Sequence, residues 1–527
     1  MPIEQREKET SRSREAIFRS EGATPSERML AQLADHSFLN LWSYPNLYRN
    51  QKVRGQGDGK ELADLLVVCG EHLLIFSEKD IGWTKAEVST AWCRWAKSAL
   101  GDSCAQVKGA YRWITEHPDE IYLDKGCTKK FPLHLPDREQ RKVHLIVVAR
   151  GATAACKRFY GGGTGSFVIN PEVCGDQHWN SFKHRVHPFV IGDINPDGHF
   201  VHVFDDASLD VVLRELDTIS DFTRYLEKRS IFLRSSHLAI AHGEEDLLAY
   251  YCLSEGAGGE HDFYHPDGRA FAFGEKIAID GSHFEAMLRH PQYLAKKRAE
   301  RVSYIWDDLI TNFTTHMLDG TSETPEGHTY DLNNSERAAR YMAHESRFKR
   351  RAHGEAVVGA IQESAKRGRF FRLMLSTEGE SDSETGFFVL IFPYLKWMEE
   401  KGRYTHYRKK RQELAEAYAY GALLRYRYLK RVVGVVLEPP KENGGSSEDL
   451  ILVEKEEWTQ EEEKEVESAC ARYQIFQDGF TERSFHASEF PAPPMDDSGT
   501  LKSQQTGLNR RARRAQARRS RKQSRSR

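Results

Sequence analysis

The sequence predicts an α/β domain at the N-terminus, then a mixed, mostly helical C-terminal region, and finally a disordered basic tail. Strand-like and helix-like apolar patterns alternate up to about residue 150, and amphipathic helical patterns dominate residues 331–430. The last eighteen residues hold ten Lys and Arg and no acidic residue. We therefore expect five parts: a flexible arm (1–22), the α/β domain (23–150), a mixed α/β middle region (151–330), a mainly helical region (331–478) and a disordered, Arg-rich tail (479–527).

Local signals predict the elements of the α/β domain in chain order. Thr24, Pro25 and Glu27 mark the start of a helix, because a threonine cap and a glutamate three residues later satisfy free backbone N–H groups and proline suits the first turn. Apolar runs of strand length follow, and a helical pattern interrupted at Gly101-Asp102 precedes a strongly apolar strand. The predicted order is a helix from residue 24, strands at 41–48, 61–68 and 72–79, helix over 85–117 and a buried strand at 142–149.

Asp64 and Lys79 are predicted to converge at one end of the hairpin formed by residues 61–68 and 72–79. If the turn centres on Gly70-Glu71, Asp64 lies opposite Ser77, and Lys79 lies diagonal to Asp64 within side-chain reach. Strand alternation places these three side chains on one face. Charged groups at the end of an apolar hairpin cost free energy, so their presence favours a functional site. The alternative is a plain ion pair across the strands.

Residues 24–150, about a quarter of the chain, resemble the restriction-endonuclease-like core of the PD-(D/E)XK nuclease superfamily in their element order. Asp64, the run Ser77-Glu78-Lys79 and the segment from Gln106 to Tyr111 carry the resemblance, and that segment is similar to the Q-x-x-x-Y element of the NERD and RecB-like branch, with one extra residue before the tyrosine. The resemblance implies a Mg²⁺- or Mn²⁺-dependent hydrolase that cleaves phosphodiester bonds, in bacterial defence or repair. The residues implied as catalytic are Asp64, Glu78, Lys79 and Gln106, and those implied as metal ligands are Glu27, Asp64 and Glu78.

One position departs from the pattern of that superfamily. The second acid normally stands two residues before the lysine, and Ser77 occupies that position here. Glu78 is adjacent, but alternation points it to the opposite face unless a bulge re-aims it. Otherwise Glu27 or Glu61 must supply the second carboxylate, and Glu27 has the simpler role of a capping-box residue. An active nuclease and a catalytically degenerate nuclease-fold scaffold that binds nucleic acid therefore both remain open.

The distribution of charge along the chain indicates what kind of molecule the protein binds. The chain has 76 Lys and Arg against 78 Asp and Glu, so without its last eighteen residues the net charge falls from -2 to about -12. An acidic body with a basic tail predicts contact with a polyanion, and we expect nucleic acid, DNA rather than RNA, as the partner. A solvated tail that binds nucleic acid only loosely is the alternative. The candidate contacts are Arg510, Arg511, Arg513, Arg514, Arg518 and Arg519.

Composition also bears on location. No apolar stretch approaches the roughly 20 residues of a membrane span, and no apolar signal segment follows the polar N-terminus. The eight cysteines are widely separated and form no C-x-x-C pair, which is typical of reduced thiols. We expect a cytoplasmic protein without a membrane partner, and we leave a homodimer open.

Two further groups are weaker candidates. The pairs His184/His187 and His199/His202 have a metal-ligand spacing, although histidines at such spacing usually lie at the surface or in satisfied positions. A set of basic residues on two predicted helices would line either a nucleic-acid groove or a solvated helix face. This set comprises Arg347, Lys349, Arg350, Arg351, Lys409, Lys410 and Arg411.

Overall fold

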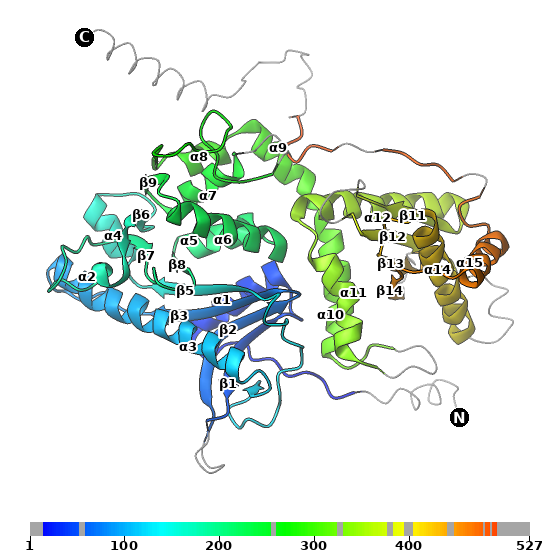
Figure 1. Cartoon of the computed structure of the whole chain (residues 1–527), viewed down its shortest axis with the longest axis horizontal. Coiled ribbons are helices and arrows are strands. Elements are labelled where there is room, and N and C mark those ends of the chain that lie inside the picture. The colour runs from blue at the N-terminus through cyan, green and yellow to red at the C-terminus, as the bar shows by residue number, and fades with distance from the viewer. Residues whose placement is uncertain are drawn as a thin grey trace, which may run out of the picture. The chain divides into compact units, whose positions relative to one another are not determined.

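The computed structural model divides the chain into two compact units (Figure 1). The N-terminal unit comprises Phe18–Arg298 and the described residues from Phe490 onward, and the C-terminal unit comprises Ala299–Glu489 with the described residues up to Ile17. The structure describes residues 14–51, 58–254, 260–323, 330–376, 383–394, 404–439, 447–477, 480–484 and 487–492. The arginines proposed to contact nucleic acid, from Arg510 to Arg519, lie outside these ranges.

Helix α1 (Pro25–Phe38) begins as its sequence predicts. The Thr24 side chain accepts a hydrogen bond from the backbone N–H of Glu27, and the Glu27 carboxylate accepts from the backbone of Thr24, which completes a capping box. Pro25 occupies the first turn, where its missing N–H has no cost. The helix buries Leu30 and Phe38 against the sheet described next.

A six-stranded mixed sheet forms the centre of the N-terminal unit (Figure 1). Strands β1, β2 and β3 are antiparallel neighbours, and β3, β5 and β8 are parallel neighbours. The predicted order of helix, three strands, helix and strand is therefore present. The strand order is β4-β1-β2-β3-β5-β8, with β1 Ser43–Arg49, β2 Lys60–Cys69, β3 His72–Asp80, β4 Ile121–Tyr122, β5 Lys142–Arg150 and β8 Val201–Asp205.

The β2–β3 hairpin has the predicted register. Leu65 pairs with Phe76 and Cys69 with His72 around the turn at Gly70-Glu71, and β3 then pairs with β5 without a register shift from His72 to Asp80. Gly70 adopts a φ of 60°, which the tight turn requires and glycine permits without strain. The boundary predicted at residue 150 does not separate two domains, because β8 continues the same sheet by pairing with β5.

Helices cover both faces of this sheet. Helices α2 (Val88–Ala96) and α3 (Asp102–Glu116) are joined by a π-helical turn at Lys97–Gly101, where the sequence predicted an interruption. Helix α3 packs on β2, β3 and β5. Side chains of successive β3 residues reach α1 and α3 in turn, so these two helices lie on opposite faces.

A second sheet and further helices complete the N-terminal unit. The sheet has the order β10-β9-β6-β7, with parallel β6–β7 and β9–β10 pairs. Its strands are β6 Val168–Cys174, β7 Val190–Asp193, β9 Leu238–Ala241 and β10 Ile277–Ile279. The remaining helices are α4 Thr153–Tyr160, α5 Ser208–Glu215, α6 Ile219–Arg234, α7 Glu244–Cys252, α8 His283–Leu288 and α9 Pro291–Ala299.

The C-terminal unit combines helices with a sheet of its own. The sheet has the order β11-β12-β13-β14, in which only the central β12–β13 pair is parallel. The predicted boundary at residue 330 falls inside this unit, which begins near Ala299. Its elements are α10 Tyr304–Leu318, α11 Leu332–Ala343, α12 Arg347–Arg367, β11 Phe370–Met374, β12 Thr385–Ile391, α14 Tyr404–Arg425, β13 Arg431–Leu437, β14 Glu448–Glu454 and α15 Gln460–Tyr473.

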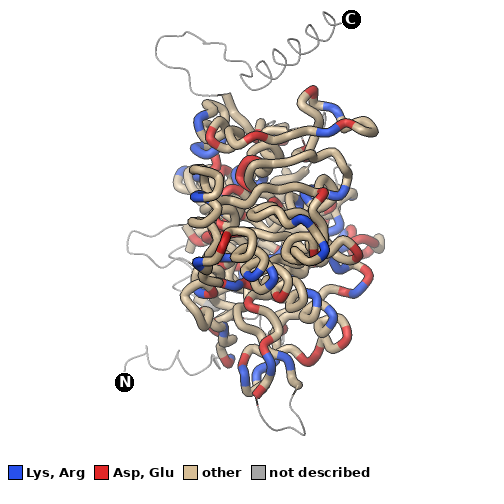
Figure 2. Tube along the Cα trace, turned by 90° about the vertical axis from the view of Figure 1, so that its left-hand side faces the viewer, with Lys and Arg blue, Asp and Glu red and all other residues tan. Residues whose placement is uncertain are grey.

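Several basic residues predicted for a groove or a solvated face are buried instead. Arg347 and Arg350 both donate to the Asp307 carboxylate at 2.7 Å, and Arg411 pairs with Asp449. Arg350 and Arg411 are at most 1% exposed, so neither offers a charge to a polyanion. In the view of Figure 2, basic and acidic residues are interspersed along the described trace.

The described residues include all eight cysteines and part of the N-terminal arm. No helix within the described ranges combines the length and apolarity of a membrane span. All eight cysteines are free thiols. Part of the predicted flexible arm is placed: the Ile17 backbone N–H donates to the Leu318 carbonyl at 2.7 Å, and Arg19 pairs with Asp35 at 2.5 Å.

Candidate functional site

Asp64 is the centre of the predicted site, and it is buried. It lies on β2 near the end of the hairpin, with only 7% of its surface exposed. Its Oδ2 atom accepts a hydrogen bond from the Glu78 backbone N–H at 2.5 Å, and Oδ1 accepts one from Gln106 Nε2 at 3.3 Å. A buried carboxylate needs such donors to compensate for lost hydration. These bonds hold both oxygens in place.

Gln106 joins the strands to helix α3. Its Oε1 atom accepts a hydrogen bond from Ser77 Oγ at 3.1 Å, while its amide nitrogen donates to Asp64. Asp64, Ser77 and Gln106 therefore lie together on the α3 face, as the register and alternation predict. Tyr111 contacts the ring of His199 at 4.8 Å between centroids, and the structure gives it no contact with Asp64.

Asn46 joins two further carboxylates beside Asp64. The neighbouring pairs Pro45–Leu65 and Leu47–Ala63 place Asn46 on β1 next to Asp64 on β2. Its Nδ2 atom donates to Glu27 Oε2 at 2.8 Å and to Glu61 Oε1 at 3.2 Å, so these two oxygens are at most about 6 Å apart. Asn46 has a φ of 50°, in a region that asparagine tolerates better than most residues. Sequence reasoning considered both acids but missed the asparagine.

Glu78 lies on the other face of β3. Its Oε1 atom is 2.9 Å from Arg150 Nε, and its Oε2 accepts a hydrogen bond from Ser26 Oγ at 2.9 Å. The register of β3 with β5 continues past Glu78 without a shift, so no bulge in that pairing turns this carboxylate to the Ser77 face. Burial raises the pKa of Glu78, against the lowering effects of Ser26 and Arg150. Its side chain is thus held by a buried ion pair that the sequence did not suggest.

Lys79 follows on the same side as Ser77 by alternation and is half-buried. Among the described residues, the structure gives no ion pair between Lys79 and Asp64, so the alternative of a plain cross-strand ion pair is not observed. Lys79 is therefore a cationic residue on the Ser77 face of β3 without an ion pair to Asp64.

The carboxylates affect one another electrostatically. Burial, together with the charges of Glu61, Glu27 and Glu78 and against the lowering effect of the Glu78 backbone hydrogen bond, raises the pKa of Asp64 to about 7. Glu61 is exposed at the start of β2, but partial desolvation and the charge of Glu27 raise its pKa. Hydrogen bonds from Asn46, Ala23 and Thr24 outweigh the desolvation of Glu27 and lower its pKa. These three carboxylates form an acidic group, but their ligand atoms do not all lie within 4.8 Å of one another, as a preformed metal site among the described residues would require. Glu27, Glu61 and Asp64 form this group, which we call the carboxylate cluster.

The raised pKa of Asp64 predicts a pH dependence of stability. An unfolded aspartate titrates near pH 4, so between pH 4 and 7 the folded chain binds more protons at this position. The free energy of unfolding therefore falls as the pH rises through this window, by an amount on the order of 2–4 kcal/mol. Asp64→Asn removes this effect. We expect its melting temperature to exceed that of the wild type at pH 8 by several degrees and to match it at pH 4, as measured by calorimetry without added metal.

Asp197→Asn is a suitable control for this measurement, because Asp197 is an exposed residue in the turn after β7. Its melting temperature is expected to follow the wild type at both pH values. A lower melting temperature of Asp64→Asn at pH 8 would contradict the inferred cost of ionising Asp64.

The predicted histidine pairs do not form metal groups of their own. His184 Nε2 lies 2.9 Å from Asp176 Oδ1, and the buried His202 contacts Arg229. The group of potential metal ligands that the described residues bring together is instead His72, His144 and Glu227. Sequence reasoning missed this group because its members are far apart in the chain. The sequence signal that existed was a histidine near the start of each of two adjacent strands.

Comparison with known proteins adds no relative, since no family model, no curated protein and no solved structure matches this chain. A functional assignment therefore rests on the arrangement of the residues and not on any relative.

Proposed function

We propose that the chain is a metal-dependent nuclease with a restriction-endonuclease-like core, acting on DNA or, as the second choice, on RNA. The observation that carries the proposal is the group of carboxylates held by Asn46 and Gln106 at the end of the β2–β3 hairpin, where Lys79 lies two residues after Ser77 on β3. Cytoplasmic action fits eight free thiols, which persist in a reducing compartment. The superfamily resemblance of the sequence supports the same assignment by analogy only.

The donors present suit Mg²⁺ or Mn²⁺, because the cluster offers only carboxylate oxygens beside an amide. Such an ion, when bound, polarises a phosphodiester and lowers the pKa of an attacking water. Glu27, Glu61 and Asp64 would hold it, in place of the implied set that included Glu78, and their oxygens would have to move closer together on binding, because they do not all lie within 4.8 Å of one another. Arg150 engages Glu78, so Glu78 would position the strand end through Ser26 and Arg150.

The remaining residues have separate roles in this proposal. Gln106 orients Asp64 by donating to Oδ1, while its own carbonyl is held by Ser77. Lys79 would place a positive charge where the phosphorane-like transition state accumulates negative charge. Half-burial of the lysine strengthens this effect, because the surrounding dielectric is lower than in water.

A cleavage assay tests the proposal. Supercoiled plasmid, linear duplex DNA, single-stranded DNA and total RNA are incubated with Mg²⁺, with Mn²⁺ and with EDTA. We expect cleavage of at least one substrate that EDTA abolishes and that Lys79→Met lowers by about 100-fold, since positioned charge is worth 2.7–4 kcal/mol at such sites. Lys97→Met, on the exposed side of the π-helical turn, is the matched control and retains full activity.

Metal affinity should depend on pH through Asp64. With a pKa of about 7, this carboxyl changes from mostly protonated at pH 6 to mostly ionised at pH 8. A cation binds the ionised form, so we expect the apparent Mg²⁺ affinity to rise about tenfold between these pH values. Calorimetric titration at both pH values measures this ratio. In Asp64→Asn the affinity is lower and the ratio approaches one; a ratio of ten in that variant would assign the proton to another group.

A non-catalytic scaffold is the second candidate, and the position of Ser77 favours it. A serine stands where the superfamily has its second acid, and its hydroxyl is engaged by Gln106. In that case nucleic acid binds in EDTA, no substrate is cleaved, and deletion of residues 510–527 removes most of the salt dependence of binding. A homodimer, which the sequence leaves open, stays untested, since a single chain is described.

A further inference from the structure

A second polar group lies at the opposite end of strand β3 from the carboxylate cluster. His72 begins β3, and His144 lies on the neighbouring strand β5, where it is level with Leu74. Both histidines are buried, at 7% and 4% exposure. Five residues separate His72 from Ser77 along β3, which corresponds to roughly 17 Å. This group is therefore spatially distinct from the carboxylate cluster.

The two imidazoles have a geometry that suits one shared ion. His72 Nδ1 and His144 Nε2 face each other at 3.3 Å, and their rings are stacked at an angle of 25°. Two nitrogens bound to a tetrahedral ion at 2.0–2.1 Å would be separated by roughly 3.3 Å. The observed separation matches this distance, and a bound ion would replace the hydrogen bond that now joins the two rings.

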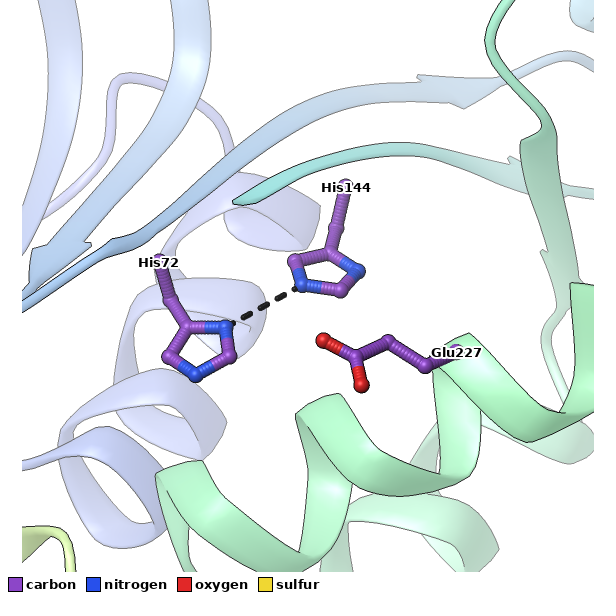
Figure 3. A group of neighbouring side chains, drawn as sticks. All are labelled: His72, His144 and Glu227. Carbon is purple, nitrogen blue, oxygen red and sulfur yellow. Dashed lines mark hydrogen bonds between the residues drawn. The ribbon is translucent and has the colours of Figure 1, made fainter. Parts of the chain in front are cut away.

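Glu227 on helix α6 completes the group. Figure 3 shows its carboxylate directed toward the space beside both rings, and one oxygen lies within 4.8 Å of a nitrogen of each histidine. Lys142 is the neighbouring cation: its ammonium is 3.8 Å from Glu227 but only 2.6 Å from Glu71. Glu71 is therefore the closer partner of Lys142, and Glu227 can turn toward the histidines without leaving the lysine unpaired.

A pocket of about 630 Å³ adjoins this group. His144 and Glu227 both line it, together with Lys142, His199 and Arg234 among others. A small molecule or a water entering this pocket thus reaches two members of the group. Three protein ligands beside an accessible cavity are typical of metal sites that keep one coordination position for an exchangeable ligand.

We propose that His72, His144 and Glu227 bind one divalent transition-metal ion with the ligand preference of Zn²⁺, and that its remaining coordination position opens into the pocket. Imidazole donors select such ions over Mg²⁺, which prefers oxygen. The exchangeable ligand is a water or a small oxyanion, because Lys142 and Arg234, each also paired with a carboxylate, bring cationic groups to the pocket wall. This proposal is independent of whether the carboxylate cluster cleaves nucleic acid.

Co²⁺ is the probe for this site, because its visible absorption is intense only in a tetrahedral environment. The full-length protein is freed of metal with a chelator and titrated with Co²⁺ in excess Mg²⁺, then with Zn²⁺. We expect one equivalent of tetrahedral Co²⁺ that Zn²⁺ displaces. Glu227→Gln and His72→Gln are each expected to weaken Co²⁺ binding at least 100-fold. Retained binding in both variants, or no tetrahedral Co²⁺ in the wild type, would overturn the proposal.

Two controls separate this site from other metal-binding groups. Asp64→Asn alters the carboxylate cluster and is expected to leave the Co²⁺ spectrum unchanged, and His199→Gln alters the pocket wall outside the ligand set and retains binding. Glu227 is partly exposed on a helix surface, so Glu227→Gln is expected to keep the wild-type melting temperature without metal. Inorganic phosphate should change the spectrum of the wild-type Co²⁺ complex; an unchanged spectrum would contradict an open coordination position.

Discussion

Replacing Asp64 by asparagine is expected to lower kcat/KM for metal-dependent cleavage by at least about 10³-fold. Asparagine has nearly the same shape and can still accept a hydrogen bond from the Glu78 backbone, so the hairpin end stays in place. The substitution removes one negative charge from the carboxylate cluster and so weakens the binding of the metal. A bound metal stabilises the transition state by several kcal/mol. Cleavage rates measured at saturating Mg²⁺ test this expectation directly.

Two further variants decide which acid completes the cluster. Glu61→Gln is expected to lower kcat/KM by a factor comparable to that of Asp64→Asn, because Glu61 shares the Asn46 amide with Glu27. Glu78→Gln is expected to have a much smaller effect on cleavage and a larger effect on stability, since its partner is Arg150. The reverse order of these two variants would restore Glu78 as the metal ligand. Cleavage that persists undiminished in Asp64→Asn would exclude the proposed site altogether.

Removing Glu244 is expected to destabilise the N-terminal unit by about 3–5 kcal/mol. Glu244, at the start of α7, forms two hydrogen bonds with Arg229 of α6, each of 2.8 Å, and accepts a third from Tyr225 at 2.6 Å. Arg229 and Glu244 are 2% and 3% exposed. In Glu244→Ala the guanidinium stays buried without its counter-charge, which costs far more than the pair itself contributes. Urea denaturation, fitted with one transition for each unit, measures the loss.

Asp210→Ala is the matched control for this loss. Asp210 pairs with Arg214 four residues later on the surface of α5, at 2.9 Å, and the arginine side chain is 69% exposed. Such a pair contributes about 0.5 kcal/mol or less. The double variant Arg229→Met/Glu244→Leu is expected to be more stable than Glu244→Ala, because no charge remains buried. Equal losses in Glu244→Ala and Asp210→Ala would show that the buried pair is not an essential contact.

Local sequence signals predicted the elements around the candidate site well. The capping box at Thr24 and Glu27, the turn at Gly70-Glu71 and the interruption near Gly101 are all present. Each depends on residues within a few positions of one another, so short-range hydrogen bonding and side-chain period determine it. The register that places Asp64 opposite Ser77 follows from the same turn, since a two-residue hairpin leaves one pairing.

Domain boundaries were predicted less well, because they depend on long-range pairing. Strands β6 and β7 of the second sheet lie between β5 and β8 in the chain, yet β8 joins the first sheet by pairing with β5. No local sequence pattern indicates which strand will be the parallel partner. The burial of Arg350 and Arg411 also depends on residues that are distant in the chain. A helical run of basic residues indicates an exposed face by composition, yet Asp307 and Asp449 lie opposite them and make burial possible.

The sequence by itself determined the elements, the hairpin register and the presence of Asp64, Ser77 and Lys79 near one strand end. Only the tertiary structure decided which carboxylates accompany Asp64: Asn46 brings Glu27 and Glu61 together, while Arg150 engages Glu78 on the other face. It also brought His72 to Glu227, 155 positions later in the chain. The physical reason is common to these cases. The free-energy cost of burying a charged side chain depends on which distant residue packs against it, and the local sequence pattern does not identify that residue.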